Sequence, residues 1–173
     1  MKLTKLLLFL ASTSALVISS DRSASATTKT ANLAVSANVV QGCSIATTAV
    51  AFVNYDPTAT SPNDSGQGTV TIACTQGVAP NIGLAFGQNS GGGTQRNMLQ
   101  TAPGTKLLPY GLYQEAGRTT AWGDGTAGGG TVLTLTAVPN NSPITKQIYG
   151  RIPALQNVPQ DTYNDLVVAS VNF

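Results

Sequence analysis

The sequence predicts an all-β fold, an antiparallel sandwich of Greek-key type, on the strength of three observations. Apolar and polar residues alternate in several short segments, which is the period of a strand with one buried face. Turn signals rich in Gly, Pro, Asn and Asp separate these segments, roughly one every dozen residues. No segment shows a sustained period of 3.6 residues, so no long helix is expected. The 173 residues are enough for one domain with its own core.

The first 26 residues have the pattern of a secretory signal peptide rather than of a membrane anchor. Lys2 and Lys5 precede an apolar run from Leu6 to Ile18, and the small-residue cleavage motif ends at Ala26. The apolar run is too short for a permanent span of a bilayer. Cleavage after Ala26 removes three of the nine basic and one of the seven acidic residues, which leaves a formally neutral chain. Neither nucleic acid nor a permanent membrane span is therefore expected.

The composition favours contact between protein surfaces over electrostatic steering. Charged residues make up 9% of the chain, against ~25% in an average globular domain. Thr, Asn, Gln, Ser, Gly and Ala take their place, and such a neutral polar surface suits close contact between copies.

An alternating segment begins almost at the predicted mature N-terminus. Leu33, Val35, Ala37 and Val39 share one face, and polar or small residues occupy the other. A period of two over this length predicts a half-buried strand.

Two cysteines, Cys43 and Cys74, follow this segment. In an exported chain an even number of cysteines predicts a disulfide, and two cysteines allow one pairing. The closed loop would restrict the unfolded chain by roughly 3.5–4 kcal/mol. A reactive thiol pair is not favoured, because the spacing is far from C-x-x-C and the chain has no histidine to activate a thiolate.

The remaining strands are predicted in order along the chain, with glycine-rich and proline-containing connections between them. The C-terminal segment carries Val167, Ala169, Val171 and Phe173 on one face, so the apolar pattern continues to the last residue of the sequence. The predicted segments after Cys43 are 50–53, 69–74, 81–86, 107–114, 131–138, 144–152 and 162–173.

The inventory of side chains argues against an enzyme. Without histidine there is no Ser-His-Asp or Cys-His arrangement and no imidazole ligand for a metal, and no cofactor is expected. The spacing of the carboxylates suggests no catalytic pair. Trp122, in a glycine-rich stretch, has two interpretations. It is either a platform for binding sugars or an interface, or a lid on the core, which is the favoured interpretation.

Several landmarks occur in an order that resembles the spore coat protein U domain family, which includes the pilin subunits of archaic, Csu-type chaperone–usher pili. The resemblance covers essentially the whole chain after the signal peptide. Its landmarks are Gln41-Gly42-Cys43, Phe52 to Pro57, Gly68 to Cys74, Arg96-Asn97-Met98, Leu108 to Tyr113, Ala121-Trp122-Gly123, Ile148 to Pro153 and Tyr163 to Phe173.

The resemblance implies an incomplete immunoglobulin-like β-sandwich that lacks its last strand. A periplasmic chaperone would fill the gap first, and the N-terminal extension of another subunit would replace it, which is a β-augmentation mechanism called donor-strand complementation. Residues 27–40 would then be the donor extension and residues 41–173 the pilin domain. Leu33, Val35, Ala37 and Val39 would enter a neighbour's groove. One wall of the chain's own groove, with the chaperone contact, would be Val167, Ala169, Val171 and Phe173.

The function that this resemblance implies is a structural subunit of a secreted surface fibre that serves adhesion and biofilm formation. Its partners would be the chaperone, an outer-membrane usher and other copies or related subunits. The protein would pass through the periplasm to the cell surface. The first alternative is a spore or cell-surface coat protein of the same fold. The second is a carbohydrate-binding or adhesin module with Trp122 in its site.

Overall fold

The computed structural model describes residues 25–101 and 103–173, and their regular structure is entirely β. The chain separates into one unit that ends at Ala37 and a second unit from Asn38 to Phe173. The predicted signal peptide, residues 1–26, lies outside the described residues apart from its last two. The predicted all-β class is confirmed.

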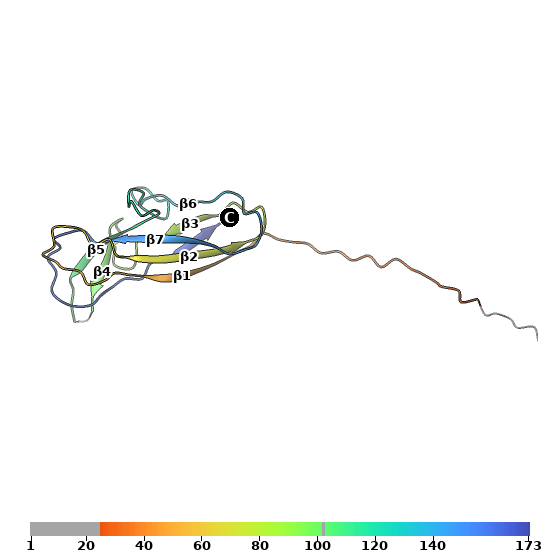
Figure 1. Ribbon diagram of the computed structural model, residues 1–173, viewed down its shortest axis with the longest axis horizontal. Helices are drawn as coiled ribbons and strands as arrows, with labels where there is room; N and C mark the ends of the chain where they lie inside the picture. Colours follow the sequence, from red (N-terminus) through yellow and green to blue (C-terminus); the bar gives the residue numbers. More distant parts are fainter. Residues whose placement is uncertain (1–24, 102) are drawn as a thin grey trace, which may run out of the picture. The chain divides into compact units, whose positions relative to one another are not determined.

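The second unit forms two antiparallel sheets (Figure 1). The larger sheet has the strand order β1-β2-β7-β5-β4-β8, and the smaller has the order β6-β3-β9. The strands are β1 (Cys43–Ala51), β2 (Gln67–Cys74), β3 (Asn81–Leu84), β4 (Arg96–Gln100), β5 (Leu107–Tyr113), β6 (Leu133–Thr134), β7 (Ile144–Arg151), β8 (Tyr163–Asn164) and β9 (Ala169–Asn172).

The core is built by alternation along the central strands. In β2 every second residue from Gly68 to Cys74 is buried, and in β5 the buried positions are Leu108, Tyr110 and Leu112. Ile82 and Leu84 of β3 meet them from the smaller sheet. A period of two therefore sends one face of each strand into the core, as the sequence predicts.

Strand β4 is a finding that the sequence pattern does not predict. Its residues include Arg96, Asn97 and Gln100, so it lacks an apolar alternation. It nevertheless pairs with β5 on one side and with β8 on the other. Backbone pairing with β5 forms this strand, and its side-chain pattern alone does not predict it.

Arg96 is a charged side chain placed in the core, where it is 5% exposed. Its guanidinium donates to three backbone carbonyls, those of Leu84 at 2.6 Å, Trp122 at 2.8 Å and Ala85 at 2.9 Å. It also lies over the ring of Phe86, with 5.5 Å between the guanidinium carbon and the ring centroid. Burial lowers the pKa of Arg96. The side chain thereby ties the end of β3 to the segment that carries Trp122.

The C-terminal segment 162–173 is one strand in prediction and two strands in the structure. β8 belongs to the larger sheet and β9 to the smaller, so residues 165–168 cross between the sheets. The carbonyls of Leu166 and Val168 accept from the amides of Gln88 and Ala85 in the crossing. The predicted strand 131–138 is likewise reduced to Leu133–Thr134 in β6.

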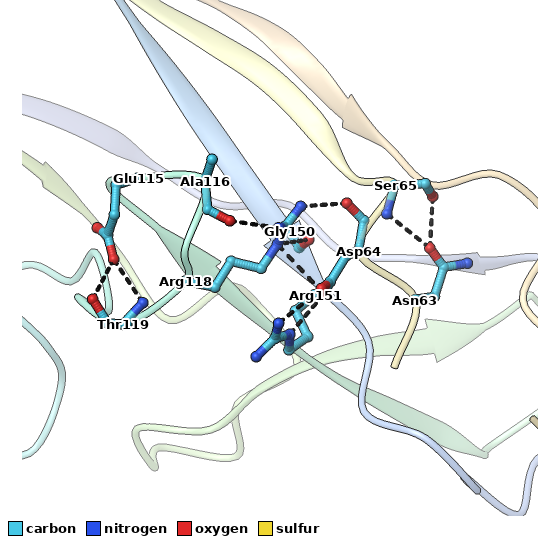
Figure 2. Close-up of polar contacts among 9 residues, drawn as sticks. All are labelled: Asn63, Asp64, Ser65, Glu115, Ala116, Arg118, Thr119, Gly150 and Arg151. Carbon is cyan, nitrogen blue, oxygen red and sulfur yellow. Dashed lines mark hydrogen bonds and ion pairs between the residues drawn. The ribbon is translucent and has the colours of Figure 1, made fainter. Parts of the chain in front are cut away.

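Asp64 joins two arginines at one side of the larger sheet (Figure 2). Arg151 of β7 donates to both Asp64 carboxylate oxygens, at 2.6 Å and 2.7 Å. Arg118 lies with its Nε 3.4 Å from the same carboxylate and also donates to the carbonyls of Gly150 and Asp64. The group therefore fixes the loop before β2 and the turn after β5 onto β7.

Asp64 predicts a loss of stability in acid. The hydrogen bond from Arg151 lowers its pKa, and the charges of Arg118 and Arg151 add to this. A carboxylate with a lowered folded pKa stabilises the fold at neutral pH, and this contribution is lost progressively as the pH falls from about 4 through the lower folded pKa. Because the Asp64 side chain is 37% exposed, we expect Asp64→Asn to cost about 1 kcal/mol at pH 7.

Urea unfolding of both proteins at pH 7 and pH 3 measures this effect. The difference between Asp64→Asn and the unmodified chain should be smaller at pH 3 than at pH 7. Arg151→Gln, which removes the main partner of the carboxylate, should flatten the same part of the pH dependence. An Asp64→Asn penalty that is equal at both pH values would contradict the assignment.

Candidate functional site

A groove lies between the outer strands of the two sheets. Within residues 25–101 and 103–173, β1 is at one end of the larger sheet and pairs with β2 alone, while β9 is at one end of the smaller sheet and pairs with β3 alone. The groove between them has a volume of about 350 Å³. Its walls come from residues 47–50 of β1 on one side and from residues 163–169 on the other.

The floor of the groove is the apolar core. Leu84, Leu112 and Ile148 line it and are 2%, 4% and 4% exposed. Met98 of β4 lies beside them and is half-buried. An apolar side chain that entered the groove would therefore be transferred from water onto packed aliphatic surface.

Phe52, just beyond β1, continues the groove past the end of the strand. Its ring rests against the backbone of Gly66 and Gly150, where a Cβ would lie 2.4 Å and 2.6 Å from ring atoms. A second hollow of about 770 Å³ shares Phe52 and Tyr163 with the first and extends along residues 50–57 and 158–164. The two hollows adjoin each other at these shared residues.

The polar side of the groove is held by Tyr110 and Asp165. The Tyr110 hydroxyl donates to Asp165 at 2.7 Å, and the same carboxylate accepts from the amide of Gln88 and from the Asn89 side chain. Burial and the bond to Asp165 raise the pKa of Tyr110, so the phenol is neutral at physiological pH. These contacts position the crossing segment 165–168 as a wall of the groove.

The predicted wall is placed differently in part. Val167 and Ala169 line the groove, and Val171 is half-buried against the core. Phe173, however, is 56% exposed and is not among the residues that line the groove. The wall is displaced toward residues 163–169 because the chain crosses between the sheets there. The opposite wall, residues 47–50 and Phe52, was not predicted, although the apolar run 50–53 could have signalled it.

The predicted donor residues are described in an extended conformation. Leu33, Val35 and Val39 are 87%, 86% and 81% exposed, and Ala37 is exposed as well. In the part of the chain that the structure describes, residues 25–42 belong to no strand. The segment is therefore not a strand of the chain's own sheet within the described residues, and its role as a donor strand stays a prediction.

The cysteines and Trp122 have clear places. Cys43 and Cys74 form a disulfide between the facing ends of β1 and β2. Trp122 is 0% exposed, and its indole nitrogen donates to the carbonyl of Ile82 at 2.9 Å. The alternative that Trp122 is a surface binding site is wrong, because the ring is enclosed by the core.

Among residues 25–101 and 103–173, no group of three or more acidic or cysteine side chains could hold a metal ion. Over the same residues, no helix is long and apolar enough to cross a membrane.

Known proteins resemble the chain in sequence and in fold. The family model described as Spore Coat Protein U domain matches residues 29–170. "Protein U" of Myxococcus xanthus is 35% identical over 162 residues, which cover 87% of this chain and 88% of that protein. The match to the family model includes residues 33–39, predicted to be donor residues, and both walls of the groove.

Among solved structures, the chain resembles one from the CsuC–CsuE chaperone–tip adhesion subunit pre-assembly complex of the archaic chaperone–usher Csu pili of Acinetobacter baumannii. The TM-score is 0.51 at 20% identity, over 78% of this chain and 40% of that one, so the match spans less than half of that chain. The Hda pilus minor tip subunit HdaB of E. coli has a TM-score of 0.41 at 14% identity, over 74% of this chain and 79% of that one, and supports no conclusion by itself. The predicted immunoglobulin-like fold of pilin type is confirmed.

Proposed function

Because the chain belongs to the spore coat protein U domain family, we propose that it is a structural subunit of a secreted surface fibre assembled by donor-strand complementation. Its groove takes a β-segment from another molecule, and its own residues 27–40 enter the groove of a further molecule. Each subunit would then carry both halves of the contact, which is the condition for a head-to-tail polymer.

One observation carries this proposal: an apolar groove between two unpaired sheet edges occurs in a chain that also has an exposed alternating segment. An unpaired edge presents free backbone donors and acceptors, and a strand laid along it completes the ladder. Side chains two residues apart on that strand point to the same face. Leu33, Val35, Ala37 and Val39 have this spacing, and the floor of the groove is apolar.

The energetics favour such an insertion. Burial of an exposed Leu or Val side chain contributes roughly 1.5–3 kcal/mol. Leu33, Val35 and Val39 are almost fully exposed, so most of this free energy is still available to an intermolecular contact. Backbone hydrogen bonds along both edges would add to it.

The expected partners follow from the same groove. A periplasmic chaperone would occupy it before assembly, and an outer-membrane usher would direct the exchange for a subunit's donor segment. The fold likeness to a chain from a chaperone–tip subunit complex supports a chaperone as partner. The fibre would lie at the cell surface and serve adhesion and biofilm formation.

A peptide experiment tests the proposal. A chain of residues 41–173 should bind a synthetic peptide of residues 27–40. The shortened chain keeps the groove and has no donor segment of its own, so the peptide has no competitor. The melting temperature should rise with peptide concentration, as expected for a ligand that binds the folded state alone. The full mature chain, residues 27–173, should form polymers that the shortened chain does not form.

A pair of matched peptides provides the control. Leu33→Ser with Val35→Ser should abolish the stabilisation, because both side chains face the groove floor. Asn32→Ser with Asn38→Ser changes the opposite face of the same segment and should leave the stabilisation intact. Donor-strand assembly is wrong if the unmodified peptide neither binds nor stabilises the shortened chain.

A coat protein of the same fold is the second candidate. The description of the family as spore coat protein U and the match to Protein U favour it. It differs from the first candidate in what surrounds it in the cell. Neighbouring genes for a chaperone and an usher, and fibres in electron micrographs that vanish when the gene is deleted, would indicate a pilus. A smooth layer without fibres would indicate a coat.

A further inference from the structure

The antiparallel pairing of β1 and β2 continues one residue beyond the disulfide. Cys43 is opposite Cys74, and the amide of Thr75 donates to the carbonyl of Gly42 at 2.9 Å. Gly42, the residue before β1, therefore continues the line of that strand. β1 begins and β9 ends at the same end of the domain (Figure 1).

The Thr75 side chain reinforces this direction. Its hydroxyl oxygen accepts from the amide of Gly42 at 3.1 Å. It also lies 3.3 Å from the carbonyl oxygens of Val40 and of Gly42, to which its proton can be donated. One threonine thus contacts the backbone at two positions, Val40 and Gly42, immediately after the predicted donor residues.

A different path for residues 33–39 would compete with assembly. The segment is joined directly to β1, and a tethered segment reaches a nearby site at a high effective concentration. It would fill its own groove if it turned back at Gln41 and Gly42 and paired with the free edge of β1. An Xaa-Gly pair is a common two-residue turn between antiparallel strands.

The two paths exclude each other. In the turned-back hairpin Gln41 and Gly42 would be the turn, and the backbone of Val40 would face Cys43. The amide and carbonyl of Gly42 would then have to leave Thr75. Every contact that Thr75 makes to Val40 and Gly42 therefore stabilises the straight path against the turned-back path.

We propose that Thr75 directs the N-terminal segment away from the chain's own groove, so that the groove accepts the segment of a second molecule. Thr75 is a positioning residue that selects intermolecular over intramolecular pairing. This inference rests on the proposed function of the groove. It adds the reason why a chain with both a groove and a donor segment does not insert its own segment into its own groove.

The test places a photo-crosslinking amino acid at Val35 in the full mature chain and measures intramolecular crosslinks to β1 or the groove in isolated monomers. Thr75→Val removes the hydroxyl and keeps the shape. It should raise the yield of these crosslinks about five-fold, the factor expected for loss of a typical side-chain hydrogen bond. Thr75→Ser retains a hydroxyl and should restore the low yield.

Thr71→Val is the matched control, because Thr71 is in β2 and bonds to Thr145 at 2.8 Å, on the side away from β1. Equal crosslink yields for Thr75→Val and Thr71→Val would overturn the role of Thr75. Uptake of the 27–40 peptide by the same proteins is measured separately. Failure of peptide uptake in every variant counts against the proposed function, whereas the crosslink ratio tests Thr75 alone.

Discussion

Replacement of Arg96 by methionine is expected to lower the free energy of unfolding by about 3–5 kcal/mol, because each buried carbonyl left without a partner costs about 1–3 kcal/mol. Three carbonyls, those of Leu84, Ala85 and Trp122, lose their donor at once. Methionine has a similar length and no hydrogen-bond donor, so the change removes the polar contacts while keeping much of the volume.

Urea unfolding of the Arg96→Met chain measures the loss, with Lys106→Met as control. Lys106 is exposed and immediately precedes β5, so its replacement should change the free energy of unfolding by about 0.5 kcal/mol or less. Arg96→Lys should be intermediate, because an ammonium group does not present the planar fork that reaches three carbonyls. A stability equal to that of Lys106→Met would show that the carbonyls find other donors.

The second large effect is expected from the disulfide. A chain with Cys43→Ala and Cys74→Ala should lose about 3.7 kcal/mol of stability by the loop-entropy model, for cysteines 31 residues apart. The alanines leave no unpaired thiol, so the comparison measures the crosslink. A reducing agent should lower the melting temperature of the unmodified chain to that of the double variant. It should leave the melting temperature of the double variant unchanged.

This loss should extend to the groove. β1 is one wall of the groove and is the end strand of its sheet, where it pairs with β2. The crosslink lies at the end of that pair, so its removal should also weaken uptake of the 27–40 peptide. Unimpaired peptide uptake by the double-alanine chain would mean that β1 keeps its position without the crosslink.

The sequence predicted well those parts of the fold in which side-chain period and burial agree. β2, β5 and β7 carry a clear alternation and lie in the middle of the larger sheet. The pairing of Cys43 with Cys74 followed from their number and the exported class. For these strands the side-chain alternation is sufficient, because each strand has a paired strand on both sides and one face in the core.

The parts that escaped prediction depend on contacts between distant segments. Arg96 reads as a surface residue because a charge is rarely buried, yet the carbonyls of Leu84 and Trp122 provide it with partners. The crossing at 165–168 has an alternating pattern that continues through it, so the period does not reveal the change of sheet. The groove wall at residues 47–50 was missed for the same reason. β1 is a wall only because residues 163–169, far away in the sequence, lie opposite it.

Under the proposed assembly, a segment that binds between the edges of β1 and β9 would make the thermal stability of this protein depend on its concentration. A segment that binds the folded chain alone, at a concentration one hundred times its dissociation constant, adds about 2.7 kcal/mol to the free energy of unfolding. Dilute and concentrated samples of the same chain should therefore melt at different temperatures. The melting temperature then depends on the protein concentration as well as on the amino-acid sequence.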